Sequence, residues 1–248
     1  MPARRKWPSN LTINVKFTGG VNLRGPILDG GWFSRASLKG CLFEQCDLGA
    51  PLFTKLDMNG CVFDEVKFGT SVAVWKDVQC TDCKFSRSAL AHITFESCQF
   101  TNVEFIETNF GDLRFMRCSF ERVITRGVKA HSVTFVEGAF KKSDFSNTQM
   151  ADCSIVKCNM DSTAWPDRKD CFLVMPQSLS VVAKTSEGKI TTEDQVKLAH
   201  LSSLYGQSTD PLIWDESLIE ELNPNSRELV MGDLYAHRIR QGPSIIEI

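Results

Sequence analysis

Large apolar residues recur at every fifth position along most of this chain. The longest unbroken run is Phe95, Phe100, Phe105, Phe110, Phe115 and Phe120. Phe33, Phe43, Phe53, Phe63 and Phe68 keep this spacing upstream, with Leu23, Leu28, Leu38, Leu48 and Met58 in the gaps, and Phe135, Phe140 and Phe145 follow downstream. These positions form what we name the large row. A five-residue period fits neither an α-helix nor a flat strand, and a short fixed period predicts a solenoid.

A second row, mostly of small residues, lies two positions before each member of the large row. It includes Cys41, Cys46, Cys61, Cys98, Val103, Cys118, Val123 and Val133, and we name it the small row. The other three positions of each five are mainly polar. Two inward positions separated by one residue suit an extended segment, because alternate side chains of a strand point to the same side. The pattern therefore predicts short strands, with the large residue at the axis and the small residue at a corner.

Segments such as CLFEQ CDLGA, VEFIE TNFGD LRFMR CSFER and SDFSN TQMAD CSIVK resemble the pentapeptide repeat family, over roughly residues 21–167. The resemblance implies a mainly β fold, a right-handed quadrilateral β-helix with four repeats in each coil. Its 29 five-residue units correspond to about seven coils. At about 4.8 Å for each stacked strand, the rod would be roughly 35 Å long.

The spacing of the large row slips once. Seven residues separate Val78 from Phe85, and Ala73 and Val78 stand where large residues are expected. We interpret this stretch as a bulge or short loop, either a tolerated insertion or a loop that meets a partner.

We expect three parts: an N-terminal segment or cap over residues 1–20, the β-helix over 21–167, and a mostly helical appendage over 168–248. The end of a solenoid exposes its core and strand edges, so the apolar stretch 171–182 is expected to cover the last coil. The appendage is expected to contain helices at Thr192–Tyr205, Pro211–Leu222 and Ser226–Arg240, from their cap and proline signals, and an extended end, SIIEI.

Charge and cysteine content narrow the class of protein. The chain has 28 basic and 30 acidic residues, and residues 21–167 carry 16 against 18, so direct binding of nucleic acid is not expected. No apolar signal segment or membrane span is recognised. Eight of the ten cysteines lie in the small row, where a thiol acts as a small apolar residue, and this favours a reducing cytoplasm. Export as an injected effector is the alternative.

The sequence offers no reaction centre. It contains no nucleotide-binding loop and no metalloprotease or serine hydrolase motif, so we expect no enzyme, no cofactor and no metal site. Cys80 and Cys83 have the spacing of a zinc or redox pair, but no second pair accompanies them. His92 and His131 are outward positions, and His200 lies on a predicted helix without a recognisable catalytic partner.

The outward positions supply the candidate site. With twenty residues in each coil, Trp32, Leu52 and Val72 would stack as an apolar column, which Trp75 could extend. Exposed apolar columns usually mark contact surfaces. We therefore predict partner binding by Trp32, Leu52, Val72 and Trp75, together with Tyr205 and Trp214 of the appendage. The occupant is a protein partner, a second copy bound through this face or the appendage, or the chain's own terminal segments.

Two further groups of outward residues could also form contact surfaces on the solenoid. Leu42 and Val62 would form a shorter apolar column on the opposite face. A basic group comprises Arg114, Arg117, Arg122, Arg126 and Lys129, interleaved with Asp112 and Glu121. It is either an ordinary solvated surface or a site for an acidic protein.

Two functions follow. The first is a non-enzymatic protein-binding module, a bacterial or phage adaptor or inhibitor of one protein target such as a toxin, a defence protein or a host protein. The second comes from the resemblance: some pentapeptide repeat proteins mimic DNA, bind DNA gyrase, and inhibit it or protect it from quinolones or toxins. That mechanism needs a strongly acidic rod, which residues 21–167 do not provide.

Overall fold

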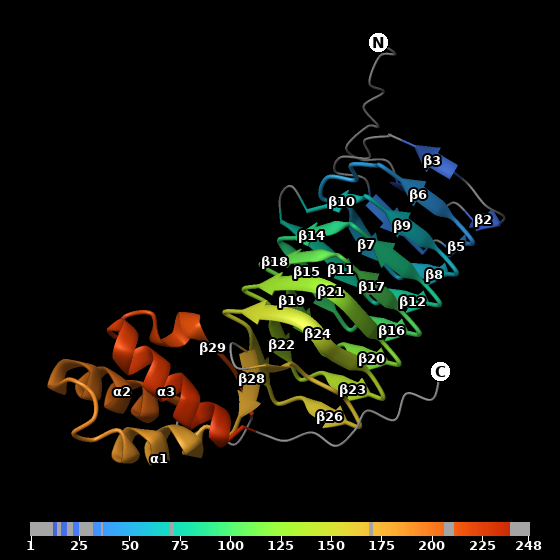
Figure 1. Ribbon diagram of the computed structural model, residues 1–248. Coiled ribbons are helices and arrows are strands. Elements are labelled where there is room, and N and C mark those ends of the chain that lie inside the picture. The colour runs from blue at the N-terminus through green and yellow to red at the C-terminus, as the bar shows by residue number, and fades with distance from the viewer. Residues whose placement is uncertain are drawn as a thin grey trace, which may run out of the picture.

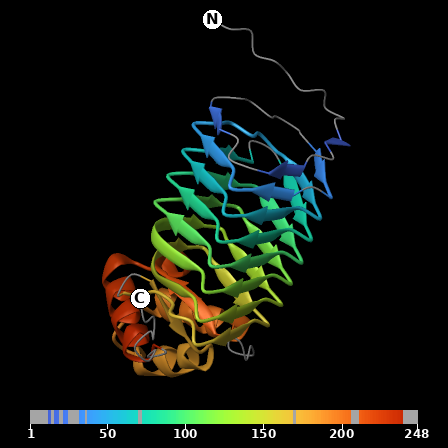
Figure 2. The same cartoon turned by 90° about the vertical axis from the view of Figure 1, so that its right-hand side faces the viewer.

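The chain forms a four-sided parallel β-solenoid with a helical appendage at its C-terminal end (Figure 1). The computed structural model describes residues 12–13, 16–18, 22–24, 32–35, 37–69, 72–168, 171–205 and 211–238. Figure 2 shows the coils stacked along one axis, with the N-terminal strands at the end away from the helices. The expected pentapeptide β-helix is confirmed, and its strand pairing begins at Thr12, upstream of the expected start at residue 21.

Two of the four faces are ladders of eight parallel strands each. The first face contains β1 (Thr12–Ile13), β4 (Trp32–Ser34), β7 (Leu52–Thr54), β11 (Ala73–Lys76), β15 (Ile93–Glu96), β19 (Arg114–Met116), β22 (Thr134–Val136) and β25 (Ser154–Val156). The second face contains β2 (Lys16–Thr18), β5 (Ser37–Lys39), β8 (Asp57–Asn59), β12 (Gln79–Thr81), β16 (Gln99–Thr101), β20 (Ser119–Glu121), β23 (Ala139–Lys141) and β26 (Asn159–Asp161).

The other two faces merge where two long strands turn the corner between them. The third face contains β3 (Asn22–Arg24), β6 (Leu42–Glu44), β9 (Val62–Asp64), β13 (Lys84–Ser86) and β17 (Glu104–Ile106). The fourth face contains β10 (Lys67–Phe68), β14 (Ala89–Ala91) and β18 (Asn109–Gly111). Both continue into β21 (Ile124–His131) and β24 (Asp144–Ala151), whose first halves lie on the third face and whose second halves lie on the fourth.

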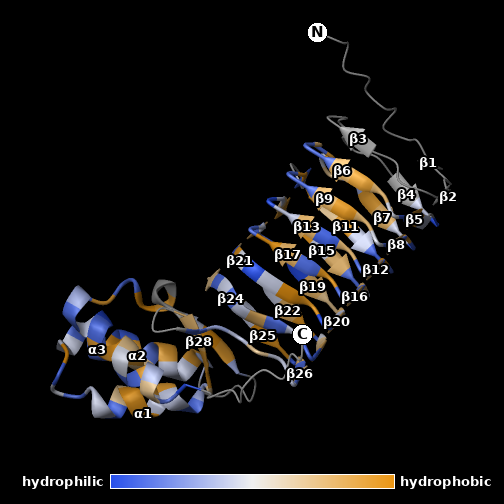
Figure 3. Cartoon of the chain, turned by 45° about the vertical axis from the view of Figure 1, so that its right-hand side comes forward, coloured by the Kyte–Doolittle hydropathy of each residue, from blue (hydrophilic) through white to orange (hydrophobic). Residues whose placement is uncertain are grey.

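The large row fills the axis of the solenoid. The ring of Phe120 lies parallel to those of Phe100 and Phe140 in the neighbouring coils, with ring centroids 5.2 and 4.7 Å apart. Parallel strands repeat at about 4.8 Å, so aromatic rings at equivalent positions stack in contact. Figure 3 shows the resulting pattern of apolar strands and polar corners.

The corners require an unusual backbone conformation. Twenty described non-glycine residues, one after each of twenty strands or strand segments, have φ between 47 and 55°. This left-handed region is unfavourable for ordinary residues. Hydrogen bonds between coils stabilise it, as where the Asn102 N–H donates to the Glu121 carbonyl at 2.9 Å. The repeat of polar residues at the corners is therefore a consequence of the turn geometry.

The predicted position of the slip is wrong. Trp75 pairs with Phe53, and Phe85 pairs with Phe63, so the register is already offset by 22 residues at Trp75. The extra two residues therefore lie between Phe68 and Ala73, and Val78 belongs to the small row. Gly69 begins this insertion with φ +82°, and a Cβ there would lie 1.5 Å from the Ala91 carbonyl oxygen. Only glycine fits at that approach.

A small antiparallel sheet joins the solenoid to the appendage. It consists of β27 (Asp167–Arg168), β28 (Cys171–Val174) and β29 (Leu212–Asp215). Cys171, Leu173 and Ile213 pack into the core of the solenoid. Alternate residues of the same strands, Phe172, Val174 and Trp214, pack into a second core. The expected cover of the last coil is thus a two-faced sheet.

The second core lies among the helices α1 (Gln177–Thr185), α2 (Thr192–Tyr205) and α3 (Pro224–Ala236), with a 3-10 turn η1 (Glu216–Ile219). The helix predicted at 192–205 is confirmed. The helix predicted from Pro211 to Leu222 is wrong, because residues 212–215 form a strand buried on both sides, and such strands lack a polar face that would reveal their period. The helix expected from Ser226 begins at Pro224, and SIIEI lies outside the described residues.

Candidate interaction surfaces

An apolar strip lies on the first face near the N-terminal coils. Leu52 and Val74 occupy consecutive places in one outward column, because the pairing of Trp75 with Phe53 sets Val74 beside Leu52. Their exposed fractions are 42% and 38%, and Val72, in the insertion, is 79% exposed. We define Leu52, Val72 and Val74 as the apolar strip. The other exposed large aliphatic side chains of the described residues are Val156 at the far end of the same face and Val181, Val196 and Leu204 in the appendage.

The structure brings together only part of the predicted site. Leu52 and Val72 are exposed as predicted, and the backbone of Trp32 pairs beside that of Leu52, while the Trp32 side chain lies outside the described part of the chain. Trp75 was predicted to lie on the same exposed surface, but it is fully buried. After the insertion it belongs to the large row, and its ring packs against Phe53 and Phe95.

The two aromatic residues predicted in the appendage are not surface anchors either. Trp214 was predicted to lie on the surface, but it is fully buried in the helical core. Tyr205 is half-buried and packs against the same core. Trp214 lies in the strand β29, where a helix with a solvent-exposed side had been predicted, whereas Tyr205 lies on α2, whose helix is as predicted.

Sequence reasoning missed Val74 and chose Val72 for the column instead. The spacing of seven residues between Phe68 and Trp75, followed by five to Cys80 and five to Phe85, was the available signal. It was overlooked because Cys80 is small for the large row. On the opposite side, Leu42 and Val62 do lie in register on the third face, each half-buried.

The basic group does not form one surface. Arg114 lies on the first face, Lys129 on the fourth, and Arg126 on the third, while Arg117 and Arg122 follow strands of the first and second faces. The five cations therefore encircle the solenoid. An acidic protein could not contact all of them at once.

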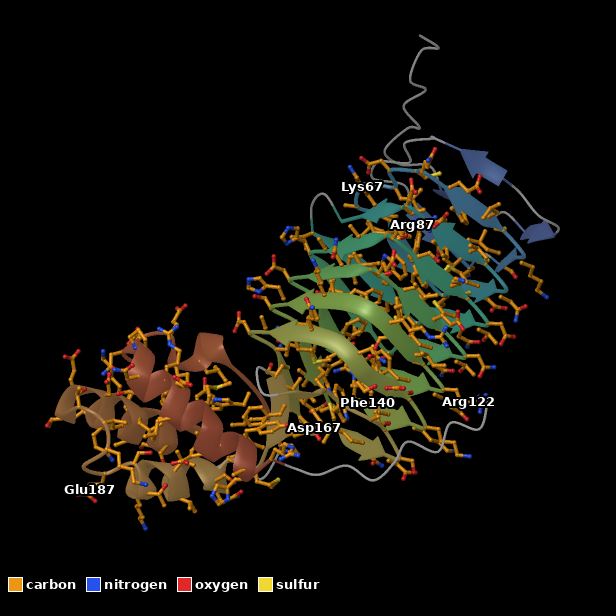
Figure 4. All side chains as sticks on the ribbon, viewed as in Figure 1. Lys67, Arg87, Arg122, Phe140, Asp167 and Glu187 are labelled. Carbon is orange, nitrogen blue, oxygen red and sulfur yellow. The ribbon has the colours of Figure 1, made fainter. Side chains whose placement is uncertain are left out.

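Ion pairs between neighbouring coils neutralise many of the outward charges. Arg87 contacts Asp64 at 2.5 Å and Glu65 at 3.3 Å, and Glu96 is contacted by Lys76 at 3.3 Å and by Arg117 at 2.7 Å. Figure 4 shows Arg87 among the other side chains that line the outside of the coils. Exposed pairs such as these contribute about 0–1 kcal/mol each, so their charges stay available to a partner.

The cysteines are structural. All ten are free thiols, and nine are buried. Burial raises the pKa of Cys80, and a hydrogen bond with the Cys61 thiol together with burial raises the pKa of Cys83. Metal binding and disulfide exchange need the thiolate, which both effects disfavour. Cys80 and Cys83 therefore lack the character of a reactive pair.

Within the described ranges, no group of three or more histidine, cysteine or acidic side chains lies close enough to hold a metal ion. The helices of the described part are all too short or too polar to cross a bilayer. His92 forms an exposed pair with Asp112 at 3.2 Å, and His131 lies 3.0 Å from Ser132.

Among the comparisons with known proteins, a family model identifies the repeat. The family model of pentapeptide repeats matches residues 79–122 in eight copies. No curated protein matches the chain. Similar solved structures include QnrB1, a plasmid-mediated fluoroquinolone resistance protein, 14% identical with a TM-score of 0.29, covering 58% of this chain and 87% of that one. Another is HetL, involved in heterocyst differentiation regulation in the cyanobacterium Nostoc sp. strain PCC 7120, 8% identical with a TM-score of 0.26, covering 62% and 88%.

Identities and TM-scores this low say nothing about activity or partners. The assignment rests on the matched repeats and on the chain's own strand pairing, which carries the same five-residue pattern along both sides of the matched segment. A large residue at the axis and a left-handed residue at the corner recur along most of the described coils. The chain therefore contains pentapeptide repeats, which the family model matches over residues 79–122.

Proposed function

We propose that the protein is a non-enzymatic binding module that docks on a protein partner through the apolar strip. The observation that carries this is the exposure of Leu52 and Val74 at consecutive places in one outward column, with the exposed Val72 two residues before Val74 in the chain. Further along the same outward column lie the polar residues Thr94, Thr134 and Ser154, and the exposed Val156 in the last coil of this face stands apart from the strip. A contiguous group of exposed aliphatic side chains at one place favours a contact there.

Charge around the strip suggests how the partner is oriented. Arg35 and Lys55 follow the strands β4 and β7 at the corner of the first face, and both are exposed. Neither forms an ion pair in the described part of the chain. An apolar centre with a polar, charged rim is the usual anatomy of a protein interface. A partner with an apolar anchor and acidic flanks would satisfy both parts.

The test is affinity copurification of the tagged full chain from bacterial lysate, read by mass spectrometry. The double variant Leu52→Glu, Val72→Glu should lose a stoichiometric partner, because carboxylates would be buried against apolar surface. The matched control, Thr134→Glu, adds a charge to the same column three coils beyond Val74 and should retain the partner. Equal capture by the double variant and the wild type would show that the strip is not the binding site.

Gyrase binding by DNA mimicry is the competing hypothesis, and the surface charge does not favour it. DNA carries one negative charge per about 1.7 Å of its length, and a mimic must approach that density. From residue 35 onward, the strands of the first face and the corner residue that follows each of them carry six basic and three acidic residues. A supercoiling assay decides: inhibition or quinolone protection of gyrase by the protein would make this hypothesis the better one.

The proposed compartment is a reducing cytoplasm. Free thiols run through the core at consecutive coils, as at Cys41, Cys61 and Cys83. Unpaired cysteines in this number are typical of proteins that fold where thiols stay reduced. An effector that folds in the cytoplasm of the producing cell before export would show the same feature.

A further inference from the structure

Two strands on opposite sides of the solenoid carry matched but opposite charges. On the third face, β17 and its corner residue read Glu104-Phe105-Ile106-Glu107. On the first face, β19 and its corner read Arg114-Phe115-Met116-Arg117. In each, the phenylalanine is buried in the core and the other three side chains point outward. We name these the acidic rung and the basic rung.

The spacing within the two rungs is the same. Each has two like charges three residues apart, with one apolar side chain, Ile106 or Met116, just before the second charge. Both segments have the same backbone, a three-residue strand followed by a corner with φ of 50° at Glu107 and 53° at Arg117. Two carboxylates and two guanidinium groups are therefore displayed on equivalent frames. The ten residues between equivalent positions are half a coil, which places the rungs on opposite faces.

The charges of both rungs are accessible. Arg114, Arg117 and Glu107 are exposed, and the Glu104 side chain is 41% exposed. Arg117 contacts Glu96 at 2.7 Å, and Glu104 lies 3.9 Å from Lys84. Such exposed pairs within one chain are weak and leave room for a second partner.

We propose that the basic rung of one molecule binds the acidic rung of a second copy of this chain. The first face of one solenoid then lies on the third face of its neighbour, with Arg114 and Arg117 against Glu104 and Glu107. Met116 and Ile106 lie between the charges and would be shielded from water by the contact. Arginine suits this role because its planar guanidinium binds carboxylates through two hydrogen bonds.

The neighbouring rungs fix the register. Along the axis, β19 lies half a coil beyond β17 and half a coil before the first half of β21, which carries Arg126. An axial offset of half a coil, about 2.4 Å, sets β19 against β17, whereas the same offset in the other direction would set Arg126 against the basic rung. The same offset sets β15, with Glu96, against β13, with Lys84 and Arg87. Opposite signs then meet at two successive rungs.

The next rung continues the pattern. With the same half-coil offset, β22 and its corner residue Glu137 face the first half of β21, which carries Arg126. Alternation of sign along one face is explained by ion pairs between coils of the same chain, as between Arg117 and Glu96. Those pairs do not require the charges of the first and third faces to match each other. The match between these two faces is therefore the feature that points to a second copy.

The contact is heterologous, and this predicts an open assembly. Each molecule uses its first face for one neighbour and its third face for the other, and these faces are on opposite sides. Because the two surfaces point away from each other, successive copies form a row and do not close into a dimer. The attraction is between solvent-exposed charges, so salt should weaken it.

Sedimentation velocity of the full-length protein over a range of concentrations tests the proposal. At low ionic strength the weight-average sedimentation coefficient should rise with concentration, and about 1 M salt should reverse the rise. The variant Arg114→Glu, Arg117→Glu and the variant Glu104→Arg, Glu107→Arg should each stay monomeric, with a dissociation constant at least about tenfold higher, because like charges would meet. All four residues are on the surface, so both variants should keep the circular dichroism spectrum of the wild type.

Mixing the two variants is the decisive step. One then supplies an acidic first face and the other a basic third face, and their unaltered faces also match, so association should return. The variant Lys141→Glu, Lys142→Glu, which makes the same change in net charge on the second face, should associate like the wild type. A wild-type protein that is monomeric at every concentration, or variants whose mixture stays monomeric, would overturn the proposal. Loss of association in the Lys141, Lys142 control would also overturn it, since net charge would then be the cause.

Discussion

At the scale of single residues, the two inward rows stabilise the solenoid through different interactions. Members of the large row supply aromatic contact along the axis, as Phe120 does between Phe100 and Phe140. Members of the small row hydrogen-bond to backbone carbonyls: Ser143 Oγ donates to the Phe120 carbonyl at 3.2 Å, and Cys118 Sγ donates to the Phe95 carbonyl at 3.5 Å. Serine and cysteine are therefore equivalent in this row, which explains why both occur there.

The first prediction concerns the axis. Phe120→Ala should lower the free energy of unfolding by about 3–5 kcal/mol, because it removes stacking on both sides and leaves a cavity that the rigid coils cannot close. Phe120→Leu should cost less, since leucine already occupies the equivalent position at Leu90. Urea denaturation followed by circular dichroism measures both. Equal losses for the two variants would mean that cavity volume is not the cause.

The second prediction concerns the small row. Cys118→Ser should change the free energy of unfolding by less than about 1.5 kcal/mol, because the hydroxyl can make the hydrogen bond that Ser143 makes. Cys118→Leu should destabilise by about 1–3 kcal/mol through overpacking at the corner. Thermal unfolding of the two variants beside the wild type provides the comparison. A serine variant as unstable as the leucine variant would contradict the equivalence of the row.

At the scale of elements, the strands and helices that depend on local sequence patterns could be predicted. Those that depend on contacts between distant segments could not. The five-residue period fixed the strands, and the cap signals fixed α2. The slip was misplaced because Trp75 and Cys80 were not recognised as members of the large row, although Trp75 packs there against Phe53. Strand β29 was taken for a helix because its burial on two sides, by two different cores, has no signature in one sequence.

Asp194 joins the helices of the appendage and carries the third prediction. Its buried carboxylate accepts hydrogen bonds from Thr191 Oγ1 at 2.8 Å and Ser226 Oγ at 2.7 Å, and from the Asn223 side chain. Burial alone would raise the pKa of Asp194, but the hydrogen bonds from Ser226, Thr191 and Asn223 outweigh it and hold the pKa below its usual range. The charged form is thus the one that stabilises the junction of α2 and α3.

The sign of the pH dependence follows from the lowered pKa. The stabilisation is fully present above the pKa of an unfolded aspartate, about 3.9, and is lost as the pH falls through the lower folded value. Asp194→Ala should destabilise the appendage by about 1–3 kcal/mol at neutral pH, because the side chains of Thr191, Ser226 and Asn223 and the Asn223 backbone N–H lose their acceptor. It should also flatten the decline of helix stability below about pH 4. Circular dichroism melts from neutral to acidic pH test this, and an unchanged slope in the variant would exclude Asp194 as its source.

At the scale of the whole molecule, the two ends of the solenoid differ. The C-terminal end is closed by β28 and β29, which insert Leu173 and Ile213 into the solenoid core. Without such a cover the last coil would expose Phe145, Ile155 and Trp165, and a parallel strand edge with apolar core beside it promotes aggregation. The appendage therefore belongs to the folding unit of the solenoid, whatever further contact its helices make.

The last prediction separates capping from any binding role of the appendage. The variant Leu173→Glu, Ile213→Glu keeps the full chain but places two carboxylates against the last coil, where neither would find a partner. We expect the midpoint of thermal unfolding to fall and the protein to aggregate at concentrations where the wild type stays dispersed. Val196→Glu adds a carboxylate to α2 at a side chain that is 66% exposed, and it should leave both properties unchanged. The alternative is a solenoid that is stable without the contacts of Leu173 and Ile213. In that case the double variant would lose the helical core but keep the circular dichroism signal of the β-helix and the solubility of the wild type. The cap would then not contribute to the stability of the coils.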